Sequence, residues 1–276
     1  MPLSITFDLE DSRTSDRQEE RFVSMSDRFL AFAQQHGIRA TVFIVGELAR
    51  THPQLVARVA AAGHEVALHG LRHVALSDVP RERMCDELRE GKALLEDVAQ
   101  TAVDGFRAPI FSLTPATAWA VDDLAATGFA YSSSVLPAAN PLQGWPAAPA
   151  TPFLWANGLV ELPCPVTGIG RAQVPFLGGI YLRYVPRWLA ARALRDLPPD
   201  AAPWSYCHPY DLDPDEPFFV MPHASWLTSR VVHTRRGATL RCLERMIAAA
   251  GGPGPPLREV AAEAGLRELP VVRSPA

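Results

Sequence analysis

The sequence predicts a single α/β domain in which strands and helices alternate along the chain. Short apolar runs alternate with longer amphipathic stretches through its first half, and glycine or proline separates them. Four side chains able to carry chemistry, Asp8, His69, Arg107 and His208, fall at the ends of expected strands. Parallel βαβ units produce this pattern, and they gather functional loops at the carboxyl edge of the sheet.

The first half contains the clearest elements. Residues 3–7 are typical of a buried strand, and residues 17–36 repeat apolar side chains at helical spacing before Gly37. Residues 40–45 are β-branched and apolar, as in a strand covered on both faces. Thr51 is expected to cap the next helix, with Pro53 in its first turn and Gly63 at its end. The pattern continues with strands over 64–69, 103–107 and 129–132 and with helices over 79–99 and 114–128.

The second half is less regular. Residues 137–179 are rich in proline, glycine and alanine, and we expect an irregular elaboration near 137–183 over the mouth of the fold, because aromatic residues are scattered through it. A helix is expected over 185–197, a strand over 203–208 and a helix over 234–250. One domain over 1–276, with a core of about 3–250 and roughly the last ten residues loosely ordered, accounts for the pattern.

Composition indicates an ordinary globular protein, with 48% hydrophobic and 20% charged residues. The net charge of −4 gives no electrostatic case for nucleic acid or an anionic membrane surface. No apolar run is long enough for a transmembrane helix, and no secretory leader is visible, so a cytoplasmic location is expected. The four cysteines are far apart without a CxxC pair, which favours free thiols in a reducing compartment.

Two histidines indicate a metal site. His69 and His73 are four residues apart, so both imidazoles can lie on one side of a helical turn or a tight loop. A carboxylate from the acidic strand end at residues 8–11 would complete the three-ligand pattern of a catalytic zinc site. Unrelated histidines can share this spacing, so the pair needs support from other segments.

Five short tracts in a fixed order supply that support: residues 6–11, 68–73, 105–112, 177–183 and 206–214. Together they make the chain resemble the polysaccharide deacetylase family, which has the NodB homology fold and is similar to carbohydrate esterase family 4. More narrowly, the chain resembles the XrtA-type subgroup from exopolysaccharide loci. The resemblance runs from about Ser4 to Ile247 and implies a distorted (β/α)7-type barrel that removes N-acetyl groups from sugars with a bound metal.

The resemblance also implies roles for particular residues. Asp8 matches the family's general base, and His69 and His73 match its two histidine ligands. The carboxylate ligand would be Glu10, which points to the same side as Asp8 if the strand continues, and Asp11 is the competing candidate. Zn²⁺ is the first choice of ion, with Co²⁺, Ni²⁺ or Fe²⁺ as alternatives.

Further roles follow from the later tracts. His208 matches the general acid that protonates the leaving amine, and Arg107 would keep Asp8 ionised through its neighbouring positive charge. The backbone N–H of Ile110, after Pro109, would help to hold the oxyanion. Pro109, Tyr181 and Trp145 are the candidates for contact with the sugar, although Tyr181 and Trp145 could equally be packing residues of a lid.

One departure from the subgroup pattern concerns the fifth strand. Subgroup members carry Tyr-Asp-Ser-Ser there, whereas this chain reads Tyr131-Ser132-Ser133-Ser134. The substitution leaves every expected ligand and proton-transfer group in place. It puts the support of Arg107 and the identity of the substrate in question.

Three functions remain open from the sequence. The first is deacetylation of an N-acetylated sugar in a saccharide, glycolipid or nucleotide-sugar precursor. The second keeps the fold but hydrolyses a formyl amide, or a cyclic amide without metal. The third is a saccharide-binding barrel without catalysis. Signatures of serine hydrolases, P-loop NTPases and dinucleotide-binding enzymes are missing, and the oligomeric state is left open.

Overall fold

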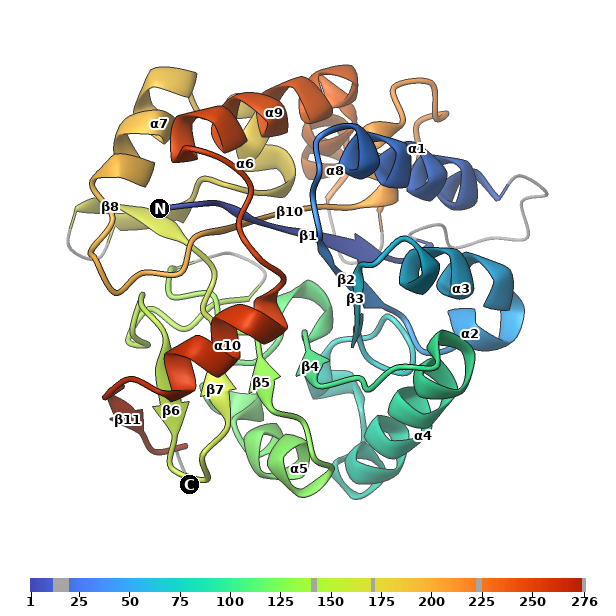
Figure 1. The fold of residues 1–276 in the computed structure, drawn as a ribbon, viewed down its shortest axis with the longest axis vertical. Helices are drawn as coiled ribbons and strands as arrows, with labels where there is room; N and C mark the ends of the chain where they lie inside the picture. Colours follow the sequence, from blue (N-terminus) through green and yellow to red (C-terminus); the bar gives the residue numbers. More distant parts are fainter. Residues whose placement is uncertain (12–19, 140–142, 170–171, 222–224, 275–276) are drawn as a thin grey trace.

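A mostly parallel sheet forms the centre of the protein (Figure 1). The computed structural model describes residues 1–11, 20–139, 143–169, 172–221 and 225–274. Within these ranges the sheet has nine strands, and β11 (Val271–Val272) joins its edge through β6 (Phe153–Trp155), which runs antiparallel to β7. The parallel strands, in spatial order, are β10 (Trp204–Cys207), β1 (Ser4–Leu9), β2 (Thr41–Ile44), β3 (Glu65–Leu68), β4 (Gly105–Phe106), β5 (Tyr131–Ser132) and β7 (Val160–Glu161).

The parallel part of the sheet curls until its two ends approach each other. β10 and β7 stand at opposite ends of the parallel order, yet the indole Nε1 of Trp204 on β10 donates to the carbonyl of Leu162 just after β7, at 3.3 Å. No backbone ladder joins β7 to β10 within the described ranges. The expected α/β fold is therefore confirmed, and its parallel strands form an incompletely closed barrel.

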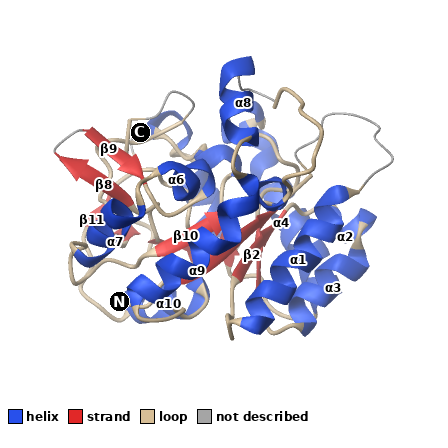
Figure 2. Ribbon diagram, turned by 90° about the horizontal axis from the view of Figure 1, so that it is seen from above, coloured by secondary structure: helices blue, strands red, loops and turns tan. Residues whose placement is uncertain are grey.

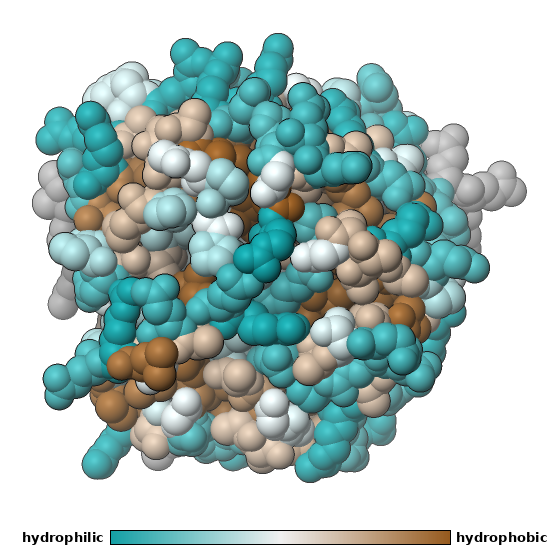
Figure 3. Space-filling view, in the orientation of Figure 1, coloured by the Kyte–Doolittle hydropathy of each residue, from teal (hydrophilic) through white to brown (hydrophobic). Residues whose placement is uncertain are grey.

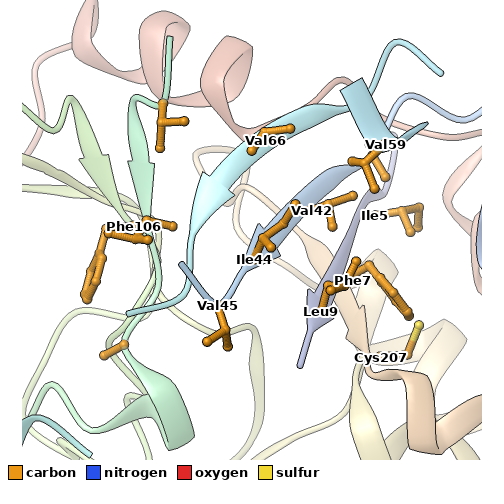
Figure 4. Packing of buried hydrophobic residues seen from close by; sticks show 14 of the residues in the cluster. Ile5, Phe7, Leu9, Val42, Ile44, Val45, Val59, Val66, Phe106 and Cys207 are labelled. Carbon is orange, nitrogen blue, oxygen red and sulfur yellow. The ribbon is translucent and has the colours of Figure 1, made fainter. Parts of the chain in front are cut away.

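Strand alternation divides the buried residues between two cores. Ile5, Phe7 and Leu9 on β1 belong to one buried hydrophobic cluster (Figure 4), and the Phe7 ring stacks on Phe29 of α1 (Arg21–Gln35) at 4.2 Å. A second core, which includes Phe43 and Trp204, fills the concave face of the sheet. The polar residues of β1 share this inner face with it, because their side chains alternate with those that face the helices.

Helices cover the outside of the sheet (Figures 1 and 2). Their apolar sides pack on the strands, as in other α/β domains. The remaining α-helices are α2 (Leu48–Thr51), α3 (Pro53–Ala61), α4 (Arg81–Ala99), α5 (Ala120–Ala126), α6 (Gly179–Tyr184), α7 (Arg187–Arg195), α8 (Trp226–His233), α9 (Thr239–Ala250) and α10 (Leu257–Gly265).

Several expected helix boundaries are wrong. Thr51 does not cap α3; it is the last residue of α2, and its hydroxyl bonds back to the carbonyl of Glu47. The helix expected over 114–128 begins with a separate 3-10 turn, η3 (Pro115–Thr117), before α5. The helix expected from residue 234 begins at Thr239 because η5 (Arg236–Ala238) intervenes. The first helix begins at Arg21, and residues 17–19 of its expected span lie outside the described residues.

The segment expected to be irregular contains strands. β6 and β7 lie within 137–179, and β8 (Val166–Ile169) pairs with β9 (Ala172–Pro175) as a separate hairpin. β7 belongs to the parallel sheet itself, so this segment is part of the barrel as well as a cover. Within the last ten residues, the two-residue strand β11 pairs with β6, and residues 275–276 lie outside the described ranges. Strands of two to four residues are too short to show a period in the sequence.

The surface has the mixed character that the composition suggested. Figure 3 shows hydrophilic residues spread over one face, with smaller hydrophobic areas between them. All four cysteines are free, and two of them, Cys164 and Cys207, are buried. Among the described residues, no helix has the length and apolar character needed to cross a bilayer.

Candidate active site

A buried ion pair lies where β1 and β4 end on the inner face of the sheet. Arg107 Nη1 binds Asp8 Oδ1 at 2.6 Å and also donates to the hydroxyl of Thr6 at 2.8 Å. Both side chains of the pair are almost fully buried. The other oxygen of Asp8, Oδ2, faces the opposite side of the site, toward His208. The pair thus holds a carboxylate in one orientation and leaves its second oxygen for chemistry.

The guanidinium of Arg107 has support on its other edges. Its Nε donates to the carbonyl of Ser133 at 3.1 Å, and its Nη2 donates to the hydroxyl of the same serine at 3.0 Å. The rings of Phe43 and Trp204 lie 4.0 and 4.2 Å from its central carbon. These cation–π contacts and hydrogen bonds stabilise a charge that burial alone would disfavour.

Beside this pair, three side chains bring together the donor atoms of a metal site. Glu10, His69 and His73 each offer one ligand atom, and these atoms lie within 4.8 Å of one another. Glu10 follows β1, His69 follows β3, and His73 comes from the loop after it. Asp11 is exposed and lies outside this set. The geometry therefore favours Glu10 over Asp11 as the carboxylate.

His69 is held in the neutral form that a metal ligand requires. Its Nδ1 lies 2.9 Å from the backbone carbonyl of Arg107. A carbonyl oxygen only accepts, so Nδ1 carries the hydrogen and the lone pair of Nε2 is left for an ion. Burial lowers the pKa of His69 to about 4, so the ring is neutral at pH 7. A neutral imidazole fixed by such a bond is the usual form of a metal ligand.

The loop between the two histidines depends on Gly70. Its φ of +75° lies in the left-handed region, and a Cβ there would meet the carbonyl oxygen of Arg72 at 2.8 Å and Pro109 Cγ at 3.2 Å. Glycine alone fits this position without strain. The two histidines therefore converge through a tight loop, one of the two conformations that their spacing allowed.

The carboxylate and the second histidine form a charged pair. Burial opposes ionisation of Glu10, but His73 outweighs it and the pKa of Glu10 falls to about 2. Burial likewise opposes protonation of His73, while Glu10 raises its pKa. His73 Nε2 is in direct contact with Glu10 Oε2. One carboxylate and two imidazoles suit a divalent transition metal, which would take the place of the proton in this contact.

His208 approaches from β10 on the other side of Asp8. It begins η4 (Pro209–Leu212), and its Nδ1 lies 2.7 Å from Asp211 Oδ2. Asp211 is fully buried, and its Oδ1 accepts from Arg183 Nη1 on α6 at 2.6 Å. Burial lowers the pKa of His208, but the hydrogen bond and charge of Asp211 prevail and raise it to about 9. His208 is thus protonated at neutral pH, as a general acid requires.

Gly178 brings Arg183 to this position. The ring of Tyr206 on β10 occupies the place where a Cβ of Gly178 would lie, at 1.9 Å. The absence of a side chain lets the start of α6 lie against β10, with a backbone bridge between Gly178 and Tyr206. The 177–183 tract therefore owes its glycines to packing, and it ends in the arginine that supports Asp211.

The turn after β4 has a strained backbone. Ile110 and Phe111 have φ values of 59° and 53° within η2 (Pro109–Phe111), where the N–H of Phe111 and that of Ser112 bond to carbonyls of the same turn. A β-branched residue in the left-handed region is an outlier that costs about 1–3 kcal/mol. Such strain persists where the surrounding structure imposes it, and here it occurs in the turn that begins two residues after Arg107.

Three consecutive serines at the end of β5, Ser132 to Ser134, form the frame behind Arg107. Ser133 binds its guanidinium, while the Ser134 hydroxyl accepts the N–H of Ala108, at 2.9 Å, and the Ser132 hydroxyl donates to Ser134, at 2.8 Å. Glu161 on β7 accepts the N–H groups of Ser134 and Val135 at 2.7 and 2.9 Å. The departure at Ser132 therefore does not remove the support of Arg107.

Some expected substrate contacts fall elsewhere. Trp145 is buried and packs against Trp155 with ring centroids 5.5 Å apart, so its ring belongs to the core rather than to a sugar platform. Pro109 is also buried and lies next to Gly70. Tyr181 is half-buried on α6, and Ile110 is half-buried at the turn. Tyr181 and Ile110 remain candidates for contact with a ligand.

Four supporting residues were missed in the sequence. Asp211 had a signal, since it follows His208 by three residues in the last tract. Arg183 had a weaker one, because it closes the 177–183 tract. Ser133 and Glu161 offered no signal beyond their residue types, because their partners lie 26 to 29 positions away in the chain.

Comparison with known families divides the chain in two. Residues 2–129 match the polysaccharide deacetylase family, and residues 133–251 match a domain of unknown function, DUF3473. The boundary falls beside β5, inside the continuous sheet. The first match contains Asp8, Arg107 and the candidate ligands, and the second contains His208 with its two supporting residues.

Curated relatives match only part of their length. The chain is 38% identical over 74 residues to a chitooligosaccharide deacetylase of Rhizobium leguminosarum bv. trifolii, covering 26% of this chain and 34% of that protein. It is 28% identical over 87 residues to a peptidoglycan-N-acetylglucosamine deacetylase of Bacillus cereus, covering 32% of each. The chain thus spans about a third of the length of these relatives.

Solved structures share the fold over nearly the whole chain. A Mycobacterium smegmatis protein assigned to the polysaccharide deacetylases has a TM-score of 0.61 at 21% identity, covering 95% of this chain and 89% of its own. A carbohydrate esterase family 4 pseudoenzyme of Bacillus anthracis has a TM-score of 0.51 at 13% identity, covering 94% of this chain and 65% of its own. At these identities the likeness establishes the fold alone.

Proposed function

We propose that the protein is a metal-dependent hydrolase that removes an N-acetyl group from an amino sugar, because residues 2–129 match the polysaccharide deacetylase family. One observation carries the proposal. A candidate ligand set, a carboxylate base and a protonated histidine meet at the carboxyl ends of strands from both halves of the chain. A binding protein without catalysis would have no need of two proton-transfer groups.

Glu10, His69 and His73 would hold one divalent ion, with zinc as the first choice. When bound, such an ion polarises the amide carbonyl and lowers the pKa of a water molecule. The donor set supports this fit, because His69 is neutral and its Nδ1 hydrogen is already engaged. In the same site, Glu10 is kept ionised by His73.

The protein's own groups would then move the protons. Asp8 Oδ2 takes the proton from the attacking water, while Oδ1 stays bound to Arg107. His208 Nε2 gives a proton to the leaving amine, and Asp211 stabilises the charged ring in that orientation. The N–H of Ile110 would donate to the oxyanion as charge develops on it.

The two matched segments would act as one domain. Four parallel strands come from residues 2–129 and three from the remainder, and β10 pairs directly with β1. Asp8 and His208 come from these two neighbouring strands. The segment that matches the domain of unknown function would thus supply the acid half of the catalytic pair.

The substrate would be an N-acetylated saccharide. The names of the relatives, which refer to chitooligosaccharide and to peptidoglycan N-acetylglucosamine, support a glucosamine-type sugar. Membership of the XrtA-type subgroup would be consistent with the 177–183 and 206–214 tracts. Tyr181 remains the proposed contact for the sugar ring, and a cytoplasmic location stays a prediction.

Two measurements test the proposal. Acetate release is followed on N-acetylglucosamine oligomers, and metal content is measured on the purified protein. We expect about one divalent ion per chain, lost in His69→Ala and kept in His36→Ala, a control that alters a half-buried histidine at the C-terminal end of α1. Absence of metal from the wild type after incubation with zinc would contradict the mechanism.

Product analysis separates the alternatives. Formate in place of acetate from a formylated sugar would favour a deformylase on the same fold. Saccharide binding with no product under any divalent metal would favour the non-catalytic barrel, a state for which the Bacillus anthracis pseudoenzyme is a precedent in fold. Either result would replace deacetylation as the function.

A further inference from the structure

The short helix α8 presents apolar side chains to solvent. Trp226 is 58% exposed and Leu227 is 67% exposed, and Val231 lies one turn further along the same side. The opposite side faces the protein, where Ser229 is buried and its hydroxyl accepts the N–H of Met221. Figure 2 shows α8 projecting from the body of the molecule. Helices at the surface of a globular protein normally have the reverse arrangement.

Aromatic and arginine side chains extend this face into a patch. The guanidinium of Arg230 lies 4.1 Å from the ring of Phe218 and 5.1 Å from that of Trp226. At the other end of α8, the guanidinium of Arg235 lies 5.3 Å from the ring of Tyr184, which is itself exposed. We call the set Tyr184, Phe218, Trp226, Leu227, Arg230, Val231 and Arg235 the α8 patch.

The charge around the patch is locally one-sided. Residues 217–243 contain four arginines and no aspartate or glutamate, in a chain with a net charge of −4. Arg236 is neutralised by Glu216, but Arg230, Arg235 and Arg241 are exposed. The overall charge conceals this excess, so it gave no reason to expect an anionic partner.

We propose that the α8 patch binds the surface of a bilayer that contains anionic lipids. Tryptophan and leucine on the outer side would enter the interface, and the arginines beside them would lie at the level of the headgroups. Each feature has its counterpart in such a surface: apolar area meets the acyl boundary, and positive charge meets lipid phosphate. The helix would lie on the membrane without crossing it.

The patch lies on the His208 side of the candidate site. Arg183, which supports Asp211, also donates to the carbonyl of Val232 on α8 at 2.9 Å. Arg236 lies over the ring of Tyr210, which stacks on His208. A bilayer at α8 would therefore be close to the site, and the favoured substrate class becomes a lipid-linked saccharide, a consequence that rests on the proposed function.

Vesicle sedimentation tests the surface without turnover. Full-length protein is mixed with vesicles of phosphatidylcholine alone or with added phosphatidylglycerol. We expect binding only with the anionic lipid, decreasing as salt rises. Leu227→Glu is expected to lower the partition coefficient about tenfold or more, because it replaces an inserted apolar side chain by a negatively charged one, which the anionic lipid repels. Arg230→Gln is expected to weaken binding and flatten its salt dependence.

Matched controls keep the result specific. Leu266 is 89% exposed at the end of α10, so Leu266→Glu makes the same change on another surface and should bind as the wild type does. Arg89→Gln on α4 is the control for Arg230. Equal binding by Leu227→Glu and wild type, or no binding to anionic vesicles, would overturn the proposal.

If the wild type dimerises without lipid and Leu227→Glu does not, the patch is the contact between two copies of this chain instead. Acetate release is measured separately, so failure here leaves deacetylation standing.

Discussion

His208 Nε2 lies 3.8 Å from Asp8 Oδ2, and each of these groups is anchored by its own buried ion pair. Arg107 holds Asp8, and Asp211, itself bound to Arg183, holds His208. The two candidate proton-transfer groups thus lie side by side, each held by a partner of its own. A reacting amide bound beside both atoms could meet a base and an acid at once.

Asp8→Asn should remove most of the activity. We expect acetate release to fall by about 10²–10⁴-fold, because the amide cannot accept the proton from water. The change also leaves the buried charge of Arg107 without its carboxylate, so the melting temperature should fall. Rates are therefore measured well below the variant's Tm, with metal content as a check. A wild-type rate on a verified substrate would disprove the role of Asp8.

Asp211→Asn should shift the pH dependence. The carboxylate raises the pKa of His208 to about 9 against the effect of burial, so without it the pKa falls. A general acid is active only while protonated, so the alkaline limb of kcat/KM should lie near pH 9 in the wild type and at lower pH in the variant. An unmoved alkaline limb would exclude His208 as the titrating group.

The raised pKa of His208 also predicts that the stability of the protein changes with pH. The pKa of His208 is raised above its ordinary value of 6.5, so its contribution to folding is complete below about pH 6.5. It is lost as pH rises through about 9. Between these values the wild type should lose more unfolding free energy than Asp211→Asn does, as measured by urea denaturation at several pH values.

Ser133→Ala and Ser132→Ala form a matched pair. Both remove one buried hydroxyl, but only Ser133 binds Arg107. Ser133→Ala leaves a guanidinium N–H without its acceptor, which costs about 1–3 kcal/mol of stability, and kcat should fall by about tenfold. Ser132→Ala should keep kcat near the wild-type value. If the two variants lose equal activity, the hydrogen bond between Arg107 and Ser133 does not determine kcat.

Gly70→Ala should uncouple the two histidines. A methyl group there meets the carbonyl of Arg72, and the positive φ adds strain of about 1–2 kcal/mol. Gly63 is a suitable control, because its φ is +79° and nothing lies within 4 Å of an added Cβ. Both variants should lose stability, and only Gly70→Ala should lose bound metal. Metal retained in Gly70→Ala would show that the loop tolerates the change.

The residues of the candidate site were largely visible in the sequence because chemistry follows strand ends in this fold. Asp8, His69, Arg107 and His208 each end an apolar run, and parallel strands bring such ends to one edge. The preference for Glu10 over Asp11 also agrees with strand alternation, since Glu10 is buried on the side of Asp8. Local pattern predicted that these positions share one edge of the sheet, and the resemblance to the family supplied their expected roles.

What holds those residues in place was decided only by the tertiary structure. Arg107 is supported by Ser133, 26 positions away, and Asp211 by Arg183, 28 positions away. Trp145 could have faced a sugar, and packing against Trp155 buried it instead. The partners of a side chain depend on how separate elements pack. Strands such as β6 and β7 are too short to produce a periodic pattern in the sequence. The sequence by itself therefore determined the candidate reactive groups and the parallel α/β arrangement. The packing of distant segments determined the orientation and the charge of those groups, and it left one face of α8 exposed.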